Sequence, residues 1–363
     1  MLQAKFEFMS IGKRLFWVTR ILILNLLLCI AISWRLWFEF EGLPQIPLFN
    51  FLPTLLPLVQ KITLGITIAY LIAVFLYPKS RLPLGIGVLL LIIVGIQDWN
   101  RIQPWFVQCV GMLALLIPFQ RLYRKYEPIE YIYLAFRISV VGFYVWAGIF
   151  KLNPGFNDYI IPYVVSPLTN YLSSFKTDIY AISSAFPYLE TLFAVGILIP
   201  KISKYSVIGL IGFHGIILLL LGPIGLNTNS VIWIWNLAMI GVLWFGIGKS
   251  EPLYNSKFWF KNRSVTWLSL CLFTILPILN FFGLYNKSSA FEIYSGTNYV
   301  ANLKMSLNGI SEISKTIEPH SYKFQDSLFI STYDLYIKEY NLPPNPDPKV
   351  IARLEQKLIQ QMK

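Results

Sequence analysis

Arg137 and Lys151 are ionisable residues within an apolar segment, residues 131–152. A charged side chain at the centre of a membrane helix costs about 2.5–3.5 kcal/mol on insertion scales, so such residues usually face protein, water or a functional site. Seven residues turn an α-helix by nearly two full turns, which places Arg137, Tyr144 and Lys151 on one stripe. The sequence therefore predicts that this stripe faces other helices or a cavity.

Two interpretations of Lys151 follow from its position alone. A lysine that is buried in an apolar pocket can lose its proton near neutral pH and then act as a general base. The alternative is snorkelling, because Lys151 lies about 30 Å along the helix from Tyr131, at the outer edge of the hydrocarbon. There its aliphatic stem can lie in lipid while its amine reaches the headgroups. Taken without their neighbours, the residues favour snorkelling.

The residues around Lys151 resemble a known active-site segment. The string Tyr144-Val-Trp-Ala147-Gly148-Ile-Phe-Lys151-Leu152 is similar to the segment that holds the catalytic lysine of vitamin K-dependent γ-glutamyl carboxylases, whose wider relatives are the bacterial horizontally transferred transmembrane (HTTM) proteins. The five numbered residues match. The resemblance implies that Lys151 deprotonates a reduced quinone, and it makes Tyr144 and Gly148 candidate cofactor-binding residues. Gly148 and Ala147 could equally serve plain helix packing.

The chain departs from the carboxylases at two places. Those enzymes have a histidine after a Trp-Asn pair between the third and fourth helices, whereas here Trp99 and Asn100 are followed by Arg101. Their large outer domain is replaced by only 79 residues. Both differences argue against γ-carboxylation of a protein, although Trp99 and Asn100 remain candidate cofactor-binding residues.

Two further residues are candidates for catalysis beside Lys151. His214 lies inside an apolar segment, where a histidine is more often a hydrogen-bonded core residue; the family has a histidine in a comparable helix, but the asparagine that follows it there is Ile217 here. Glu190 could pair with Lys151 or with Arg101, and pairing for stability alone is an equal alternative. Asp98 and Arg101 could form a simple interfacial ion pair.

Composition sets the class of protein. The chain of 363 residues is 56% apolar and 13% charged, with a mean hydropathy of +0.58, which excludes a soluble enzyme or a secreted module. The net charge of +12 does not indicate nucleic-acid binding. Residues 285–363 hold nine of the 30 Lys and Arg residues and eight of the 18 Asp and Glu residues, so 21 and 10 remain in residues 1–284. The basic excess therefore belongs to the apolar part. The two histidines and three dispersed cysteines match no metal-site spacing.

Nine apolar stretches qualify, or nearly qualify, as transmembrane helices, which need about 20 residues each. They are residues 15–38, 54–77, 82–97, 105–119, 131–152, 187–200, 206–226, 230–248 and 264–284. The third, fourth and sixth are short, so we expect them to be tilted, extended by flanking residues or packed inside the bundle.

The connections between these stretches alternate in charge. One set is rich in Lys and Arg, and such connections stay in the cytoplasm. Its members are Lys5, Lys13, Arg14, Lys79, Arg81, Arg121, Arg124, Lys125, Lys201, Lys204, Lys249, Lys257, Lys261 and Arg263. This pattern predicts a multi-pass protein of the cytoplasmic (inner) membrane, with a cytoplasmic amino terminus and an extracytoplasmic tail.

Two segments outside these stretches have a predicted structure. Residues 153–186 favour a re-entrant or surface-lying segment on the outer face. The tail, residues 285–363, has the composition of a small α+β domain, with strands expected at Phe291–Tyr294 and Tyr322–Phe324. It should end in an amphipathic helix that begins after Asp347.

We therefore expect an all-α polytopic membrane protein, with a nine-helix HTTM-like bundle in residues 1–284 and a small outer domain in residues 285–363. The leading hypothesis is a membrane enzyme that binds a lipid-soluble small molecule, such as a quinone, in an outward-facing pocket with Lys151 as base. The alternative is a transporter or a non-catalytic subunit whose outer domain docks a membrane or periplasmic protein. In that case Lys151, Glu190 and His214 only hold helices together.

Overall fold

The computed structural model is mostly helical, with one small antiparallel sheet. It describes residues 9–38, 43–49, 51, 55–77, 83–119, 128–248, 264–297, 302–306, 313 and 315–362. Many of the predicted basic connections lie outside these residues, including Lys79, Arg121 and Lys257.

Six helical segments in this part of the chain are long and apolar enough to cross a membrane. They are α1 (Ile11–Ile32), α3 (Pro57–Leu76), α6 (Ile129–Ile149), α11 (Ser203–Leu221), α12 (Ser230–Gly241) with its π-helical continuation to Gly248, and α13 (Ser264–Leu270) with its π-helical and 3₁₀ continuations to Phe282. These helices fit a multi-pass integral membrane protein.

The three stretches predicted to be short hold short helices. They are α4 (Leu84–Gly95), α5 (Pro104–Leu116) and α10 (Phe186–Gly196), and a five-residue helix, α2 (Trp34–Phe38), follows α1. Proline near the start of α3, α5 and α10 suits a helix amino terminus, where the missing N–H would have no partner within the helix. Each of the nine predicted stretches thus contains a helix, while the structure supports six spans by length.

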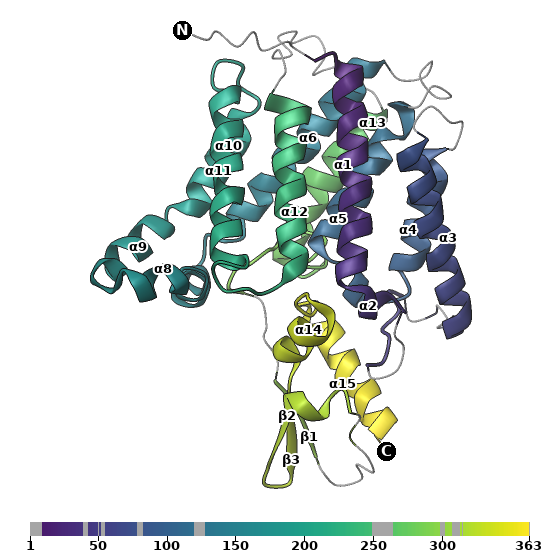
Figure 1. Ribbon diagram of the computed structural model, residues 1–363, viewed down its shortest axis with the longest axis vertical. Helices are drawn as coiled ribbons and strands as arrows, with labels where there is room; N and C mark the ends of the chain where they lie inside the picture. Colours follow the sequence, from purple (N-terminus) through teal and green to yellow (C-terminus); the bar gives the residue numbers. More distant parts are fainter. Residues whose placement is uncertain are drawn as a thin grey trace.

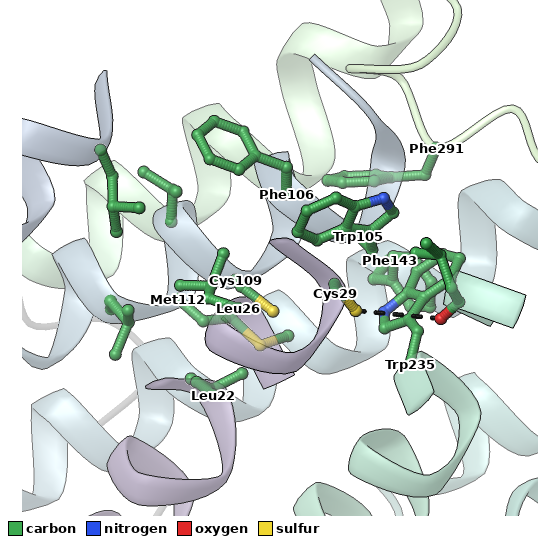
Figure 2. Packing of buried hydrophobic residues seen from close by; sticks show 14 of the residues in the cluster. Leu22, Leu26, Cys29, Trp105, Phe106, Cys109, Met112, Phe143, Trp235 and Phe291 are labelled. Carbon is green, nitrogen blue, oxygen red and sulfur yellow. Dashed lines mark hydrogen bonds between the residues drawn. The ribbon is translucent and has the colours of Figure 1, made fainter. Parts of the chain in front are cut away.

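Helix α6 lies at the centre of the bundle. In its most apolar stretch of 18 residues, 89% of the residues are buried, whereas the corresponding share is 28% for α3 and for α11. It packs mainly against α10 and α13. Figure 2 shows part of the buried core, in which Leu22 and Leu26 of α1, Cys109 and Met112 of α5 and Trp235 of α12 lie near one another. The peripheral helices instead expose large apolar side chains, which suits a surface covered by lipid.

Residues 153–186 form a chain of short helices outside the main bundle. They are a π-helical turn (Phe156–Ile160), α7 (Ile161–Val164), α8 (Ser166–Tyr171), a 3₁₀ turn (Ser173–Phe175) and α9 (Lys176–Ser183). Figure 1 shows α8 and α9 at one side of the bundle, near one end of it. Apolar side chains such as Tyr171, Phe175 and Ile182 are exposed there, as expected for a segment that lies at a membrane surface.

The tail contains the sheet and two helices. Its elements are β1 (Asn302–Ser306), β2 (Ser321–Phe324), β3 (Ser327–Ser331), α14 (Thr332–Tyr340) and α15 (Pro348–Met362). The strand order is β1-β3-β2, with all pairs antiparallel. Figure 1 places these elements at the end of the bundle opposite the start of α1.

The structure confirms two predictions about the tail and overturns one. A strand covers Tyr322–Phe324, and Asp347 caps α15, where its carboxylate accepts a hydrogen bond from the backbone N–H of Lys349 at 2.9 Å. The predicted strand at Phe291–Tyr294 is wrong. Phe291 and Tyr294 have φ angles of +66° and +47°, which are incompatible with extended backbone, so this segment forms tight turns.

Candidate functional site

The predicted stripe on α6 faces other helices, as expected. The Arg137 guanidinium donates a hydrogen bond to the carbonyl oxygen of Ile197, which follows α10. Tyr144 contacts His214 on α11, and Lys151, in the turn after α6, contacts Glu190 on α10. The spacing of seven residues therefore directs three polar side chains toward α10 and α11.

Lys151 forms an ion pair with Glu190, one of the two partners that the sequence offered for this glutamate. Lys151 Nζ lies 2.6 Å from Glu190 Oε2, and the two side chains are 14% and 18% exposed. The amine is thus bound to a carboxylate in a mostly enclosed position. Such a pair is costly to separate, because each charge would be left in a poorly solvated environment.

A second polar chain joins Tyr144, His214 and Asn236. The amide nitrogen of Asn236 donates to the carbonyl oxygen of Ile232 at 2.7 Å, which turns its Oδ1 toward His214. His214 Nδ1 lies 2.5 Å from this Oδ1 and so carries the proton that it donates. His214 Nε2 is then an acceptor in the neutral ring, and the Tyr144 hydroxyl donates to it over 2.5 Å.

The two polar groups line one cavity of about 140 Å³. Helices α6, α10, α11 and α12 contribute Tyr144, Glu190, His214 and Asn236, and Lys151 comes from the turn that follows α6. The rest of the wall is predominantly apolar and aromatic; it includes Phe143, Ala147, Phe156, Ile160, Ile161, Phe186, Phe213, Ile217, Leu220, Ile232, Trp235 and Tyr294. The cavity therefore suits an apolar molecule with a small polar group.

This arrangement can exchange protons without creating net charge. Transfer of one proton from Lys151 to Glu190, along their 2.6 Å contact, gives a neutral amine and a neutral carboxylic acid. The amine is then a base that faces the cavity. Tyr144, whose hydroxyl donates to His214, can accept a hydrogen bond from a hydroxyl group of a ligand and so orient it.

Ala147 and Gly148 are neighbours in the sequence but have different surroundings. Ala147 lines the cavity, whereas Gly148 lies against α10, where an added Cβ would overlap the hydroxyl of Thr191 and approach the carbonyl oxygen of Pro187 to 2.8 Å. Gly148 thus serves the close contact between α6 and α10. It supports the site through packing, since it is not among the residues that line the cavity.

Trp99 and Asn100 are not brought to this cavity. They lie in the 3₁₀ turn Trp99–Arg101 between α4 and α5. The Trp99 carbonyl oxygen accepts a hydrogen bond from the side chain of Asn345, and the Asn100 side chain accepts one from the backbone N–H of Asn345. Both residues hold the tail in place, a contact that links positions about 245 residues apart.

Asn236 is the site residue whose role sequence reasoning missed. It was assigned no role from the sequence, whereas it is buried within α12 and its Oδ1 determines which nitrogen of His214 carries the proton. An isolated asparagine in an apolar helix signals such a partner, because its amide must find hydrogen bonds inside the bundle.

No group of three or more His, Cys, Asp or Glu side chains that could hold a metal ion occurs in the part of the chain that the structure describes. Comparisons of the chain with protein-family models, with curated proteins and with solved structures found no match.

Proposed function

We propose that this protein is a membrane enzyme that binds a lipid-soluble small molecule in the cavity beside Lys151 and removes a proton from it. The supporting observation is that Tyr144 of α6, Lys151 in the turn after it, Glu190 of α10 and His214 of α11 meet at one apolar cavity. Lys151 acts as the base after it passes a proton to Glu190, and Tyr144 orients the acidic group of the substrate.

A reduced quinone is the substrate class that this proposal favours. Its ring is flat and apolar, and its hydroxyl groups are weak acids that become reactive toward oxygen when they lose a proton. The similarity of Tyr144–Leu152 to the lysine segment of the carboxylase and HTTM proteins supports the same choice. With Arg101 in place of the family histidine after Asn100, we do not extend the proposal to γ-carboxylation.

The proposed placement is a nine-helix bundle in the inner membrane, with the amino terminus in the cytoplasm and the tail outside. Lys13 and Arg14 lie at the start of α1, and Lys201 and Lys204 lie at the connection of α10 to α11. Figure 1 places both regions at the end of the bundle far from the tail. This distribution agrees with the retention of basic connections on the cytoplasmic side.

A reporter fusion tests this orientation. Alkaline phosphatase, which is active only outside the cytoplasm, should be active when fused after Lys363, and a green fluorescent protein fused there should be dark after export in its unfolded form. A fluorescent fusion without phosphatase activity would contradict the orientation and place the tail in the cytoplasm.

Substitution of Lys151 by arginine tests the catalytic proposal. Arginine keeps the positive charge and can still pair with Glu190, but it does not release a proton in proteins. With a reduced naphthoquinone as probe, the protein should accelerate oxygen uptake, and Lys151→Arg should lower the acceleration by about 100-fold or more. The matched control is Lys201→Arg, at an exposed lysine outside the cavity.

Full acceleration by a folded Lys151→Arg protein would overturn the assignment of the base. Absence of acceleration by the parent would overturn the choice of substrate class. Extraction of the purified protein with organic solvent, followed by mass spectrometry, would then identify the bound lipid or show that none is present. A protein without ligand or turnover would support the alternative, a transporter or a non-catalytic subunit in which these polar contacts hold helices together.

A further inference from the structure

A second, larger cavity adjoins the cavity beside Lys151. Its volume is about 520 Å³, against about 140 Å³ for the cavity beside Lys151. Its wall includes residues of both the bundle and the tail, such as Trp105 at the start of α5 and Tyr333 of α14. Five residues line both cavities: Ile160, Ile232, Trp235, Ile293 and Tyr294. These five residues, here called the common wall, lie where the two cavities meet.

The common wall draws its residues from three parts of the chain. Ile160 ends the π-helical turn before α7, and Ile232 and Trp235 belong to α12. Ile293 and Tyr294 come from the turns that follow the last helical segment of the bundle. All five side chains are apolar or aromatic, and none of them carries a charge at neutral pH. The common wall therefore acts on a ligand through its shape and position.

Tyr294 reaches from one cavity to the other. Its hydroxyl accepts a hydrogen bond from Asn229 Nδ2 at 3.0 Å, and Asn229 lines the larger cavity but not the smaller one. The polar end of Tyr294 is thus held on the side of the larger cavity. Because Tyr294 also lines the cavity beside Lys151, the rest of this residue lies between the two spaces.

The backbone is fixed on both sides of Tyr294. Before it, Phe291 is 1% exposed, and its ring stacks on that of Phe273 with the centroids 5.5 Å apart. After it, the Ser295 carbonyl oxygen accepts a hydrogen bond from the side chain of Asn153 at 2.7 Å. Between these points Tyr294 has a φ angle of +47°, which is uncommon for a bulky residue and persists where the surroundings impose it. The position of the ring is therefore well defined.

Trp235, the other ring of the common wall, is part of the helical core. Its indole nitrogen donates a hydrogen bond to Gln108 of α5 at 2.7 Å, and its ring lies edge-on to that of Phe143. Removal of Trp235 would therefore create a cavity between helices and destabilise the bundle. Tyr294 comes from a turn outside the helices, so its ring can be removed without a change in helix packing.

The cavity beside Lys151 has room for a compact ligand only. Pockets for drug-sized molecules have volumes of about 300–1,000 Å³, and the 520 Å³ cavity lies within this range whereas the 140 Å³ cavity lies below it. A ligand that outgrows the smaller cavity must displace part of its wall, and such overpacking is destabilising. The common wall is the place where empty space lies directly behind the wall.

We propose that Tyr294 sets the upper size of the ligand that binds beside Lys151, because its ring closes that cavity toward the larger one. This inference rests on the proposed function for the identity of the ligand. It adds that the substrate is compact, with a ring system that ends at Tyr294. Without this ring, the two cavities become continuous and the site accepts a longer molecule.

Two quinones that differ by one fused ring test the proposal. They are 2,3-dimethyl-1,4-naphthoquinone and 2,3-dimethyl-1,4-anthraquinone, in which methyl groups block the carbon atoms that would react with the exposed Cys271. Their dissociation constants for the full-length protein are measured by equilibrium dialysis in detergent, with protein-free micelles as the blank. The parent should bind the naphthoquinone about tenfold more tightly, because the additional ring overpacks the cavity.

Tyr294→Gly should abolish this preference. Glycine adopts a positive φ angle without strain, so the variant should fold, and the space left by the ring admits the third ring of the anthraquinone. Binding of the anthraquinone should tighten about tenfold, while binding of the naphthoquinone should not tighten. Tyr294→Phe is the matched control, because it keeps the ring and should keep most of the preference. Tyr159→Ala, at an exposed tyrosine that lines the larger cavity but not the smaller one, should keep it as well.

Naphthalene and anthracene separate this inference from the proposed function. These hydrocarbons have the same ring systems as the two quinones but no oxygen atoms, so their binding does not depend on a proton-accepting site. A preference for naphthalene that Tyr294→Gly abolishes, together with a lack of binding by both quinones, would support the role of Tyr294 and contradict the choice of a quinone as substrate.

An unchanged ratio of the dissociation constants within both pairs, in a folded Tyr294→Gly protein, would overturn the proposal. Equal weakening of the smaller and the larger compound would overturn it too, since that result is expected if Tyr294 only stabilises the junction of the tail and the bundle. Failure of the parent to bind any of the four compounds would also overturn it, because the cavity would then take no aromatic ligand.

Discussion

Arg101 and Lys151 are two enclosed cations with opposite surroundings. Arg101 is 1% exposed, and its guanidinium donates to the backbone carbonyl oxygens of Leu36, Trp37 and Val94 and to the side chain of Gln60. Lys151 instead meets one carboxylate at the wall of a cavity. Backbone acceptors from separate segments make Arg101 a structural centre, whereas a proton-accepting partner beside a cavity makes Lys151 suitable for chemistry.

The protonation chemistry of the two sites differs as well. Burial lowers the pKa of Arg101 to about 10, which leaves it charged at neutral pH. Burial also raises the pKa of Asp98, while the charge of Arg101 opposes that rise. Asp98 accepts hydrogen bonds from Ile46 and Asn100, and Arg101 acts on it through its charge, so the direct ion pair between Asp98 and Arg101 stays a prediction. A charge in an apolar region therefore indicates function only when its partner can take the proton and a ligand can reach it.

Removal of Arg101 should produce the largest loss of stability. Arg101→Leu leaves three backbone carbonyl oxygens without their donor, and breaking a buried charged network of this kind costs roughly 3–5 kcal/mol. We expect a clear fall in the apparent melting temperature in detergent, measured by tryptophan fluorescence. Lys338→Gln, at an exposed lysine of α14, is the control. A melting temperature equal to that of the parent would contradict the structural role of Arg101.

Removal of the partner of Lys151 should have a smaller effect that a second substitution reverses. Glu190→Leu leaves an unpaired ammonium group on a side chain that is 14% exposed and so keeps some contact with solvent, and we expect a loss of roughly 1–3 kcal/mol. The double variant Lys151→Met, Glu190→Leu should recover most of this stability, because it also removes the charge. Thermal unfolding of both single variants and the double variant gives the coupling. Additive losses of stability would show that the two side chains do not interact. Lys151 would then not depend on a carboxylate partner, and the proposed contrast with Arg101 would be wrong.

Local spacing was enough to predict part of the site. The seven-residue interval from Arg137 to Tyr144 to Lys151 fixed which side chains share a face of α6, and the predicted pairing of Glu190 with Lys151 is present. The position of Trp99 and Asn100 could not be predicted, because it depends on contacts with Asn345 far along the chain. Asn236 was missed for the same reason, since its partner lies on another helix.

For the fold as well, features that depend on neighbouring residues were predicted better than features that depend on distant parts of the chain. Apolar runs located the helices, including the three short ones, but the number of runs does not determine how many of them cross the membrane. The alternation of apolar and polar residues wrongly predicted a strand at Phe291–Tyr294. Phe291 and Tyr294 have positive φ angles, and a hydropathy pattern gives no information about backbone dihedral angles. Asp347 and Pro348 located the start of α15 correctly, because a helix cap depends on neighbouring residues alone.

The contacts between the tail and the amino-terminal third affect the order of assembly during synthesis. Glu339 pairs with Arg35, Asn341 donates to the carbonyl oxygen of Ile32, and Lys357 donates to that of Gln45. The partners in these contacts are separated by more than 300 residues. The end of α1 and the segment after it therefore cannot make these contacts until residues 339–357 have been translated. During that interval, a chaperone on the side of the membrane where the tail folds has access to this surface.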